Sequence, residues 1–378
     1  MKAIICGATV AGLTLAAQIG AAGWHVLVLE EAAGLAYPDD LIDFFGPGYA
    51  AAEHLNLIGP LRAVGYAIPE IVWLDQSGRP VARLHYRQVE RALGGKLISL
   101  LRGDLERVLL ATIPRSTEVR FGLSVAGIHL GGGGVEISLN DGSTEHADLL
   151  VGADGIHSRV RQLLFEDGEL AFQYLGLHRA SYVFADPAIH DSLADEFMVM
   201  STPGRRAAFY PLRGGMTAVF FTHRQPSTAL PTSAAAALSE TYKDFGWIVP
   251  QVLQHARRGS DICYDCVGQI ELSRWCLGRV ALLGDACQAV SVAGQAASLA
   301  VHAACVLAHE LATGDPIPTA LGRYEQKLKP IVHHTQRWDR RAAEWFVPAT
   351  RLRLGVRNAA VRLVDHPSMN WVLRPLLA

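Results

Sequence analysis

"KAIICGATVAGLTLAAQIGAAGWHVLVLE", residues 2–30, is the stretch that decides the fold class. Its first five residues read as a short buried strand, and the turn Gly7–Gly12 leads straight into an apolar helix. Gly23 follows as the predicted C-terminal cap of that helix. Residues 24–30 read as a second buried strand that ends on Glu30. This order predicts a βαβ unit, and therefore an α/β fold with a parallel, Rossmann-like sheet.

The glycine turn also predicts a ligand. Gly7 and Gly12 stand where the first and third glycines of a GxGxxG fingerprint belong, and Thr9 takes the middle position. Such glycines let backbone N–H groups approach a pyrophosphate at a helix N-terminus. An acid about 20 residues further on accepts hydrogen bonds from a ribose, and Glu30 fits that spacing. The pattern predicts a dinucleotide site, and its alternative is a tight turn without a ligand.

Two later motifs narrow the choice of cofactor. "GADGIHSRVR", residues 152–161, places Asp154 between a strand and a helix. "GRVALLGDA", residues 278–286, is a strand that delivers Asp285 to an apolar helix of small residues. In this order, and with "ISLLRGDLERVLL" at 98–110, the motifs resemble the group A flavoprotein monooxygenases, the para-hydroxybenzoate hydroxylase-like family. The resemblance spans nearly the whole chain.

The resemblance implies FAD as the cofactor and NAD(P)H as a co-substrate. It implies that Glu30 binds the adenosine ribose, that Arg102 contacts the flavin side and that Val125 lies by the adenine. It also implies that Asp285 accepts from the ribityl chain, and that the apolar helix behind it packs under the flavin. The expected cofactor-binding residues are Gly7, Thr9, Val10, Ala11, Gly12, Glu30, Arg102, Val125, Asp154, Asp285, Gly294, Gln295, Ala296 and Ala297.

The chain is expected to contain an FAD-binding domain with an inserted β-sheet substrate domain, followed by C-terminal helices. The expected boundaries are 1–171 and 271–316 for the two parts of the FAD-binding domain, 172–270 for the sheet domain and 317–378 for the helices. Strands between 118 and 152 read as a β-meander. Candidate substrate contacts are Phe45, Gly46, Tyr210 and Phe220, and strand alternation sends Tyr210 and Phe209 to opposite faces.

Composition excludes several classes of protein. The net charge is −2 and charged residues are 19 %, which gives no basis for binding nucleic acid. The Gly284–His309 stretch is interrupted by Gln, Ser and His, so a buried helix is favoured over stable membrane insertion. The six cysteines form no disulfide framework or metal motif, and Cys263 and Cys266 belong on opposite faces of a strand. No signal peptide precedes the first strand, so a cytoplasmic location is expected.

The favoured function is an FAD- and NAD(P)H-dependent monooxygenase acting on a hydrophobic small molecule, in natural-product tailoring or aromatic or polyketide oxidation. The flavin loop departs from the family pattern: it has Cys287 and Gln288, no proline, one residue fewer before Gly294, and Ala296 in place of a glycine. Two alternatives therefore stay open. One is a non-redox cyclase, such as a [4+2] cyclase, or an isomerase that keeps FAD structurally. The other is a cofactor-free ligand-binding relic. The oligomeric state is not predicted.

Overall fold

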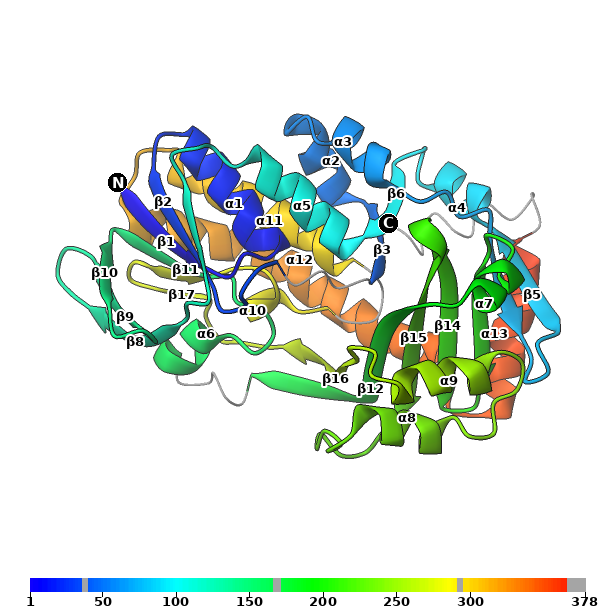
Figure 1. Cartoon of the computed structure of the whole chain (residues 1–378). Coiled ribbons are helices and arrows are strands. Elements are labelled where there is room, and N and C mark those ends of the chain that lie inside the picture. Colours follow the sequence, from blue (N-terminus) through cyan, green and yellow to red (C-terminus); the bar gives the residue numbers. More distant parts are fainter. Residues whose placement is uncertain (36–39, 166–170, 291–294, 366–378) are drawn as a thin grey trace. The chain divides into compact units, whose positions relative to one another are not determined.

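The computed structural model describes residues 1–35, 40–165, 171–290 and 295–365, and it divides into two compact units (Figure 1). Each unit is assembled from three segments of the chain. The first unit contains Met1–Gly65, Leu100–Gln173 and Gly268–Asp339; the second contains Tyr66–Ser99, Tyr174–Val267 and Arg340–Ala378.

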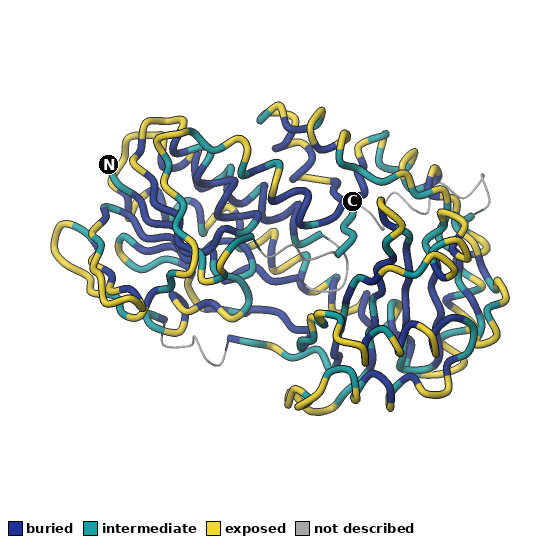
Figure 2. The backbone as a smooth tube through the Cα atoms, viewed as in Figure 1, coloured by how far each residue is buried: buried dark blue, intermediate teal, exposed yellow. Residues whose placement is uncertain are grey.

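A six-stranded sheet forms the centre of the first unit, and its four inner strands are among the most buried parts of the chain (Figure 2). The strand order is β17-β18-β11-β1-β2-β7. Every pairing is parallel except that of β17 with β18. The strands are β1 (Lys2–Cys6), β2 (His25–Glu30), β7 (Glu118–Phe121), β11 (Leu149–Gly152), β17 (Cys276–Leu277) and β18 (Val280–Leu282). The predicted α/β fold with its opening βαβ unit is confirmed.

Helices cover this sheet, and α1 (Val10–Ala21) connects β1 to β2. It packs against α11 (Ala296–Leu311) and α5 (Arg102–Thr112) and carries no charged residue, because it is covered on both sides. α11 also packs against α2 (Pro47–His54). The other helices of this part of the chain are α3 (Ile58–Val64), α6 (Arg159–Leu164), α10 (Asp285–Gln288) and α12 (Ile317–Phe346), which continues into the second unit.

Two expectations for the first unit need correction. The β-meander is shorter than predicted, because β7 and β11 join the parallel sheet beside β2 and β1. The antiparallel sheet contains only β8 (Val125–Leu130), β9 (Val135–Leu139) and β10 (Thr144–Ala147). The apolar stretch after Asp285 is not one helix either: α10 ends at Gln288, and α11 begins at Ala296. Strands β3 (Leu41–Phe45) and β6 (Leu97–Leu101) form a separate pair.

A seven-stranded sheet, in the order β16-β12-β15-β14-β13-β4-β5, forms the second unit. The strands are β4 (Glu70–Leu74), β5 (Pro80–His85), β12 (Phe172–Ala185), β13 (Phe197–Thr202), β14 (Arg205–Leu212), β15 (Met216–Arg224) and β16 (Cys263–Ile270). The helices are α4 (Tyr86–Ala92), α7 (Pro187–Ser192), α8 (Ala234–Thr241), α9 (Val249–Arg257) and α13 (Arg351–Val364), with a short turn of 3-10 helix at Arg213–Gly215.

The two faces of this sheet differ. One face, which includes Phe209 and Phe221, packs with residues of α8 and α9 into a single core. Tyr210 lies on the other face, as the alternation along the strand predicted. Cys263 is exposed and Cys266 is buried, which also agrees with opposite faces of β16.

The second unit also contains segments outside the expected range 172–270. β4 pairs in parallel with β13, with Val72 opposite Met198, and β5 pairs with β4, so two strands of the segment Tyr66–Ser99 belong to the sheet. Residues from 340 onward belong to the same unit, in which α13 packs against β5 and β13. Within the described part of the chain, no helix is long and apolar enough to cross a bilayer.

Candidate functional site

The glycines of the first turn are required by close backbone contacts. Gly7 has φ +107°, and a Cβ there would lie 2.3 Å from the carbonyl oxygen of Ala153. A Cβ on Gly12 would lie 2.1 Å from the carbonyl oxygen of Gly7. Only glycine fits these two positions, which explains why the first and third glycines of the fingerprint are present.

Thr9 replaces the middle glycine and caps α1. Its hydroxyl accepts from the N–H of Gly12 at 3.4 Å and donates to the carbonyl of Ala153 at 2.9 Å. The N–H groups of Val10 and Ala11 have no acceptor among the described residues, as is usual for the first turn of a helix. Both residues are buried, and the first turn contains no acid. This helix start therefore offers two donors and a positive dipole end to an anion.

Glu30 lies directly beside the turn. Its carboxylate accepts from the N–H of Ala8 at 2.8 Å and from that of Ala32 at 3.0 Å, one bond for each oxygen. Each oxygen keeps capacity for another donor, such as a ribose hydroxyl. The backbone carbonyl of Glu30 accepts from Leu123 N at 3.0 Å, which holds the start of β8, with Val125, alongside.

Asp154 has a structural task that the sequence did not predict. Its carboxylate accepts from the N–H groups of Arg159 and Val160, at 2.7 and 3.1 Å, and from the hydroxyl of Ser158. These bonds cap the start of α6, and burial raises the pKa of Asp154. An approaching cofactor would meet a carboxylate whose two oxygens are already engaged.

Arg161 joins the second motif to the third, and the expected site omitted it. The side chain is buried, and it donates to the carbonyls of Ala286 at 2.9 Å and Ile156 at 2.6 Å. Burial lowers its pKa. The available signal was its place three residues after the capping Ser158, on the inner side of α6. Gly284, like Gly7 and Gly12, leaves no room for a side chain, because a Cβ there would lie 2.7 Å from the Cβ of Ala11.

Arg102 is surrounded by carboxylates. Its side-chain Nε donates to the carboxylate of Glu106 at 3.2 Å, and its backbone N–H donates to the backbone carbonyl of Asp40 at 2.9 Å. Burial opposes its charge, but Asp285, Glu106 and Asp40 together raise its pKa above the usual value. Burial also raises the pKa of Glu106 to about 7, against the effect of Arg102. Asp285 itself has no hydrogen-bond partner within the described ranges, so its oxygens can accept from a ligand.

Ser298 connects the start of α11 to the segment between Phe45 and Gly48, where β3 ends and α2 begins. Its hydroxyl accepts from Gly48 N at 3.0 Å and donates to the carbonyl of Phe45. A Cβ on Gly48 would lie 2.3 Å from the carbonyl oxygen of Ser298, so glycine lets the two helices meet. Phe45 and Gly46 therefore lie beside the α11 turn that contains Gln295, Ala296 and Ala297. Gly294 lies outside the described residues.

Gln288, one of the departures from the family pattern, is buried and bonded inside the unit. Its amide nitrogen donates to the hydroxyl of Tyr324 at 2.8 Å, and that hydroxyl donates to the carbonyl of Leu282 at 2.9 Å. The amide nitrogen thus links α10 to α12, whereas the amide oxygen is buried without a hydrogen-bond partner among the described residues. Tyr210 and Phe220 belong to the second unit, where their rings stack at 6.2 Å and 25°. The four candidate substrate residues are therefore divided between the two units.

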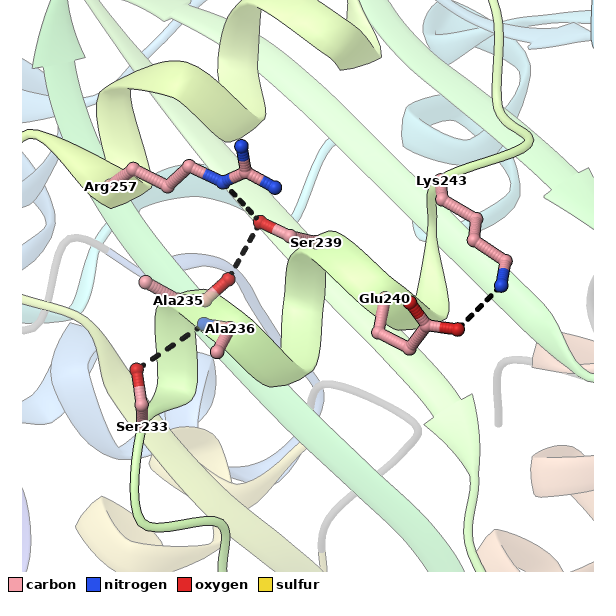
Figure 3. Close-up of a pocket in the computed structure, with 7 residues that line it drawn as sticks. All are labelled: Ser233, Ala235, Ala236, Ser239, Glu240, Lys243 and Arg257. Carbon is pink, nitrogen blue, oxygen red and sulfur yellow. Dashed lines mark hydrogen bonds and ion pairs between the residues drawn. The ribbon is translucent and has the colours of Figure 1, made fainter.

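A surface hollow over α8 and α9 is a different feature (Figure 3). Its polar groups bind one another: Arg257 donates to Ser239 at 2.9 Å, Ser239 donates to the carbonyl of Ala235 at 2.8 Å, and Lys243 pairs with Glu240. It contains none of the expected site residues.

The residues of the first unit fit FAD. Among the described residues, the helix start at Thr9 keeps two N–H groups without an acceptor for a diphosphate, and Asp285 makes no hydrogen bond and can accept from hydroxyl groups. Glu30 has acceptor capacity for a ribose. Two cradle glycines, Gly7 and Gly12, leave no room for a side chain.

The comparisons with known proteins agree. The model of the FAD binding domain family matches residues 82–339. The chain is similar to a flavin-dependent monooxygenase of Legionella longbeachae, at 26 % identity over 92 % of this chain and 90 % of that protein. It is also similar to the aurachin C monooxygenase/isomerase of Stigmatella aurantiaca, at 26 % identity over 86 % and 84 %. The solved structure of Klebsiella pneumoniae HpxO, complexed with FAD and uric acid, has the same fold, with TM-score 0.81 and 22 % identity over 100 % of this chain and 96 % of that chain.

These findings define a class of protein: a flavoprotein oxidoreductase built on an FAD-binding fold. More particularly, the chain belongs to the FAD binding domain family, and the resemblance to the group A flavoprotein monooxygenases is confirmed.

Proposed function

We propose that the chain is a monooxygenase that binds FAD non-covalently and uses NAD(P)H and O2 to hydroxylate a hydrophobic small molecule. The overall reaction converts substrate, O2, NAD(P)H and a proton into hydroxylated substrate, water and NAD(P)+. The observation that supports it best is the arrangement around α1. There, two N–H groups without an acceptor in the described part of the chain, the acceptor Glu30, and Asp285, which makes no hydrogen bond with that part, belong to one compact unit.

When bound, FAD supplies the redox chemistry, taking a hydride from NAD(P)H and activating oxygen. The protein's part is to bind, orient and shield. Val10 and Ala11 offer N–H donors to the diphosphate, and Arg102 places a positive charge beside Asp285. The small side chains at the start of α11 let the backbone approach the cofactor. Gln295, Ala296 and Ala297 are the proposed contacts there.

The test begins with purified protein. We expect FAD to copurify with the protein or to bind on titration, as seen in the visible absorbance. A protein that is colourless once excess FAD has been added and the free flavin removed would refute the proposal. NAD(P)H consumption and O2 uptake are then followed with candidate aromatic and polyketide substrates. The monooxygenase predicts that both rise together with product formation.

The cyclase or isomerase alternative is separated by removing oxygen. Under anaerobic conditions, the monooxygenase should form no product even when NAD(P)H is present. Product formed without oxygen, with the flavin remaining oxidised, would replace the proposal by a non-redox function. The altered segment between Asp285 and Ala296 makes this control necessary, since the family uses that region beside the flavin.

A further inference from the structure

Helix α13 exposes apolar side chains and buries a charged one. It packs against β5 and β13 of the second unit (Figure 1). Arg357 and Val361 are buried on the packed side. A surface helix of a globular protein normally has its apolar residues on the packed side and polar residues on the side that faces water. The exposed side of α13 departs from this rule.

Leucine and valine occupy that exposed side. Leu352 is 77 % exposed, Val356 57 % and Leu363 63 %, and Ala359 is exposed as well. Spacings of four, three and four residues place these side chains on one face of an α-helix. We call the four residues the apolar stripe of α13. Water is an unfavourable environment for such side chains, so a surface that covers the stripe is stabilised by it.

Arginines border the apolar stripe. Arg351, Arg353 and Arg362 lie roughly 100° from it around the helix, on both sides, and all three are exposed. α13 contains no Asp or Glu. Arg353 pairs with Glu344, and Arg362 donates to the carbonyl of Val81 at 2.5 Å. Arg351 makes no hydrogen bond or ion pair with the described residues. Two of the three arginines therefore have a charge that no described carboxylate binds.

The helix is held in place without the apolar stripe. Thr350 caps its first turn. From the packed side, Arg357 donates to the hydroxyl of Ser201 at 3.3 Å. Just beyond the last turn, Asp365 accepts from the backbone N–H of His85 at 2.8 Å. The stripe can therefore contact another surface while the helix keeps its fold and its place on the sheet.

A second copy of the chain fits this face poorly. A symmetric pair would set the arginines of one α13 against those of the other, and like charges at close range repel. Stable complexes also use about 20–30 residues from each partner, far more than the stripe supplies. A lipid surface has neither problem. An apolar stripe enters the boundary between headgroups and acyl chains, and arginines beside it attract anionic headgroups.

We propose that α13 is a peripheral membrane-binding surface: the apolar stripe enters the outer layer of a bilayer that contains anionic phospholipid, and Arg351, Arg353 and Arg362 contact the headgroups. The helix lies on the bilayer and does not cross it. Because the stripe has few large side chains, binding is reversible and sensitive to salt. This inference goes beyond the proposed function and does not depend on it.

Co-sedimentation of the purified protein with vesicles tests the proposal. Vesicles of phosphatidylcholine alone are compared with vesicles that contain about 30 % phosphatidylglycerol, and the anionic vesicles should bind at least about fivefold more protein. Salt at about 0.5 M should release most of it, because screening shortens the range of the attraction. Changing Leu352→Ser and Leu363→Ser together should weaken binding at least about tenfold, since two apolar side chains leave the interface. Leu230→Ser, at a leucine outside α13 that is 53 % exposed, is the matched control and should bind like the wild type.

Three results would overturn the proposal: no binding to the anionic vesicles, equal binding to both kinds of vesicle, or equal binding of the wild type and the double serine variant. A wild type that is a dimer in lipid-free buffer, and a monomer after the same double change, would assign the stripe to a second copy of the chain and would also overturn it. Circular dichroism checks that the variants are folded. If the double serine variant is not, Arg351→Gln with Arg362→Gln decides instead: it should lose the preference for anionic vesicles, and an unchanged preference would contradict the proposal.

Discussion

Asp285 is the residue of the segment 278–286 that is expected to contact FAD. Its carboxylate makes no hydrogen bond with the described residues and can accept from a ligand, while its charge helps to keep the buried Arg102 protonated. We predict that Asp285→Ala weakens FAD binding at least about tenfold, the loss expected for hydrogen bonds to a charged acceptor. Quenching of FAD fluorescence on titration with apoprotein measures this. Asp244→Asn, in the second unit, is the control, and equal FAD affinities in both variants would show that Asp285 has no such role.

Glu106 gives the first unit a pH dependence with a definite sign. Burial raises the pKa of Glu106 to about 7 in the folded protein, from 4.5. The folded state therefore holds the proton more tightly than the unfolded state, and stability falls as the pH rises from about 4.5 to 7. By linkage the loss reaches about 3 kcal/mol.

We predict that the unfolding free energy of the apoprotein, from urea titrations, decreases less between pH 5 and pH 8 in Glu106→Gln than in the wild type. The neutral amide oxygen can still accept from Arg102, so the variant keeps that contact. The same decrease in both proteins would exclude Glu106 as the titrating group.

Thr9 and Asp154 show what residue patterns can and cannot predict. The sequence placed Thr9 at the middle glycine position, but its capping of α1 depends on the carbonyl of Ala153, far away in the chain. Asp154 is expected among the cofactor-binding residues, and this stays a prediction; its capping of α6 was not predicted. Arg161 was missed because its partner, the carbonyl of Ala286, is fixed only by tertiary folding.

At the level of elements, helical glycines differ in whether the surrounding atoms leave room for a side chain. We predict that Gly12→Ala destabilises the protein by about 2 kcal/mol or more, since the added Cβ would lie 2.1 Å from a carbonyl oxygen. Gly322→Ala, in α12, is the matched control: a Cβ there meets nothing within 4 Å, and alanine favours a helix. Urea unfolding compares them, and equal effects would contradict the close packing of the turn.

Local sequence patterns predicted single strands better than they predicted which strands pair in a sheet. The expected sheet domain at 172–270 does contain strands such as β15 (Met216–Arg224), whose alternation is a local property of the sequence. The parallel pairing of β4 with β13 joins segments more than a hundred residues apart, and nothing in either segment encodes it. The same limit explains β7: its sequence reads as a strand, but its place beside β2 depends on the whole sheet.

At the scale of the whole molecule, each unit has a core of its own, and both are discontinuous in sequence. The low share of charged residues, 19 %, follows from two sheets whose strands are covered by helices on at least one face. The proposed FAD contacts all belong to the first unit.

This division into two units predicts which segments FAD protects from amide hydrogen exchange. A ligand that binds only the folded state stabilises the elements it contacts and suppresses their local opening. Adding FAD to apoprotein should therefore slow amide hydrogen exchange at least about tenfold in the segments around Gly7–Gly12, Glu30 and Asp285. Exchange in α8 and α9, which lie in the second unit and share a core with its sheet, should change by less than about twofold. Mass spectrometry of peptides from the two units measures both. Equal protection of α8, α9 and the glycine turn would mean that FAD stabilises the chain globally, and the assignment of the cofactor contacts to the first unit would lose this support.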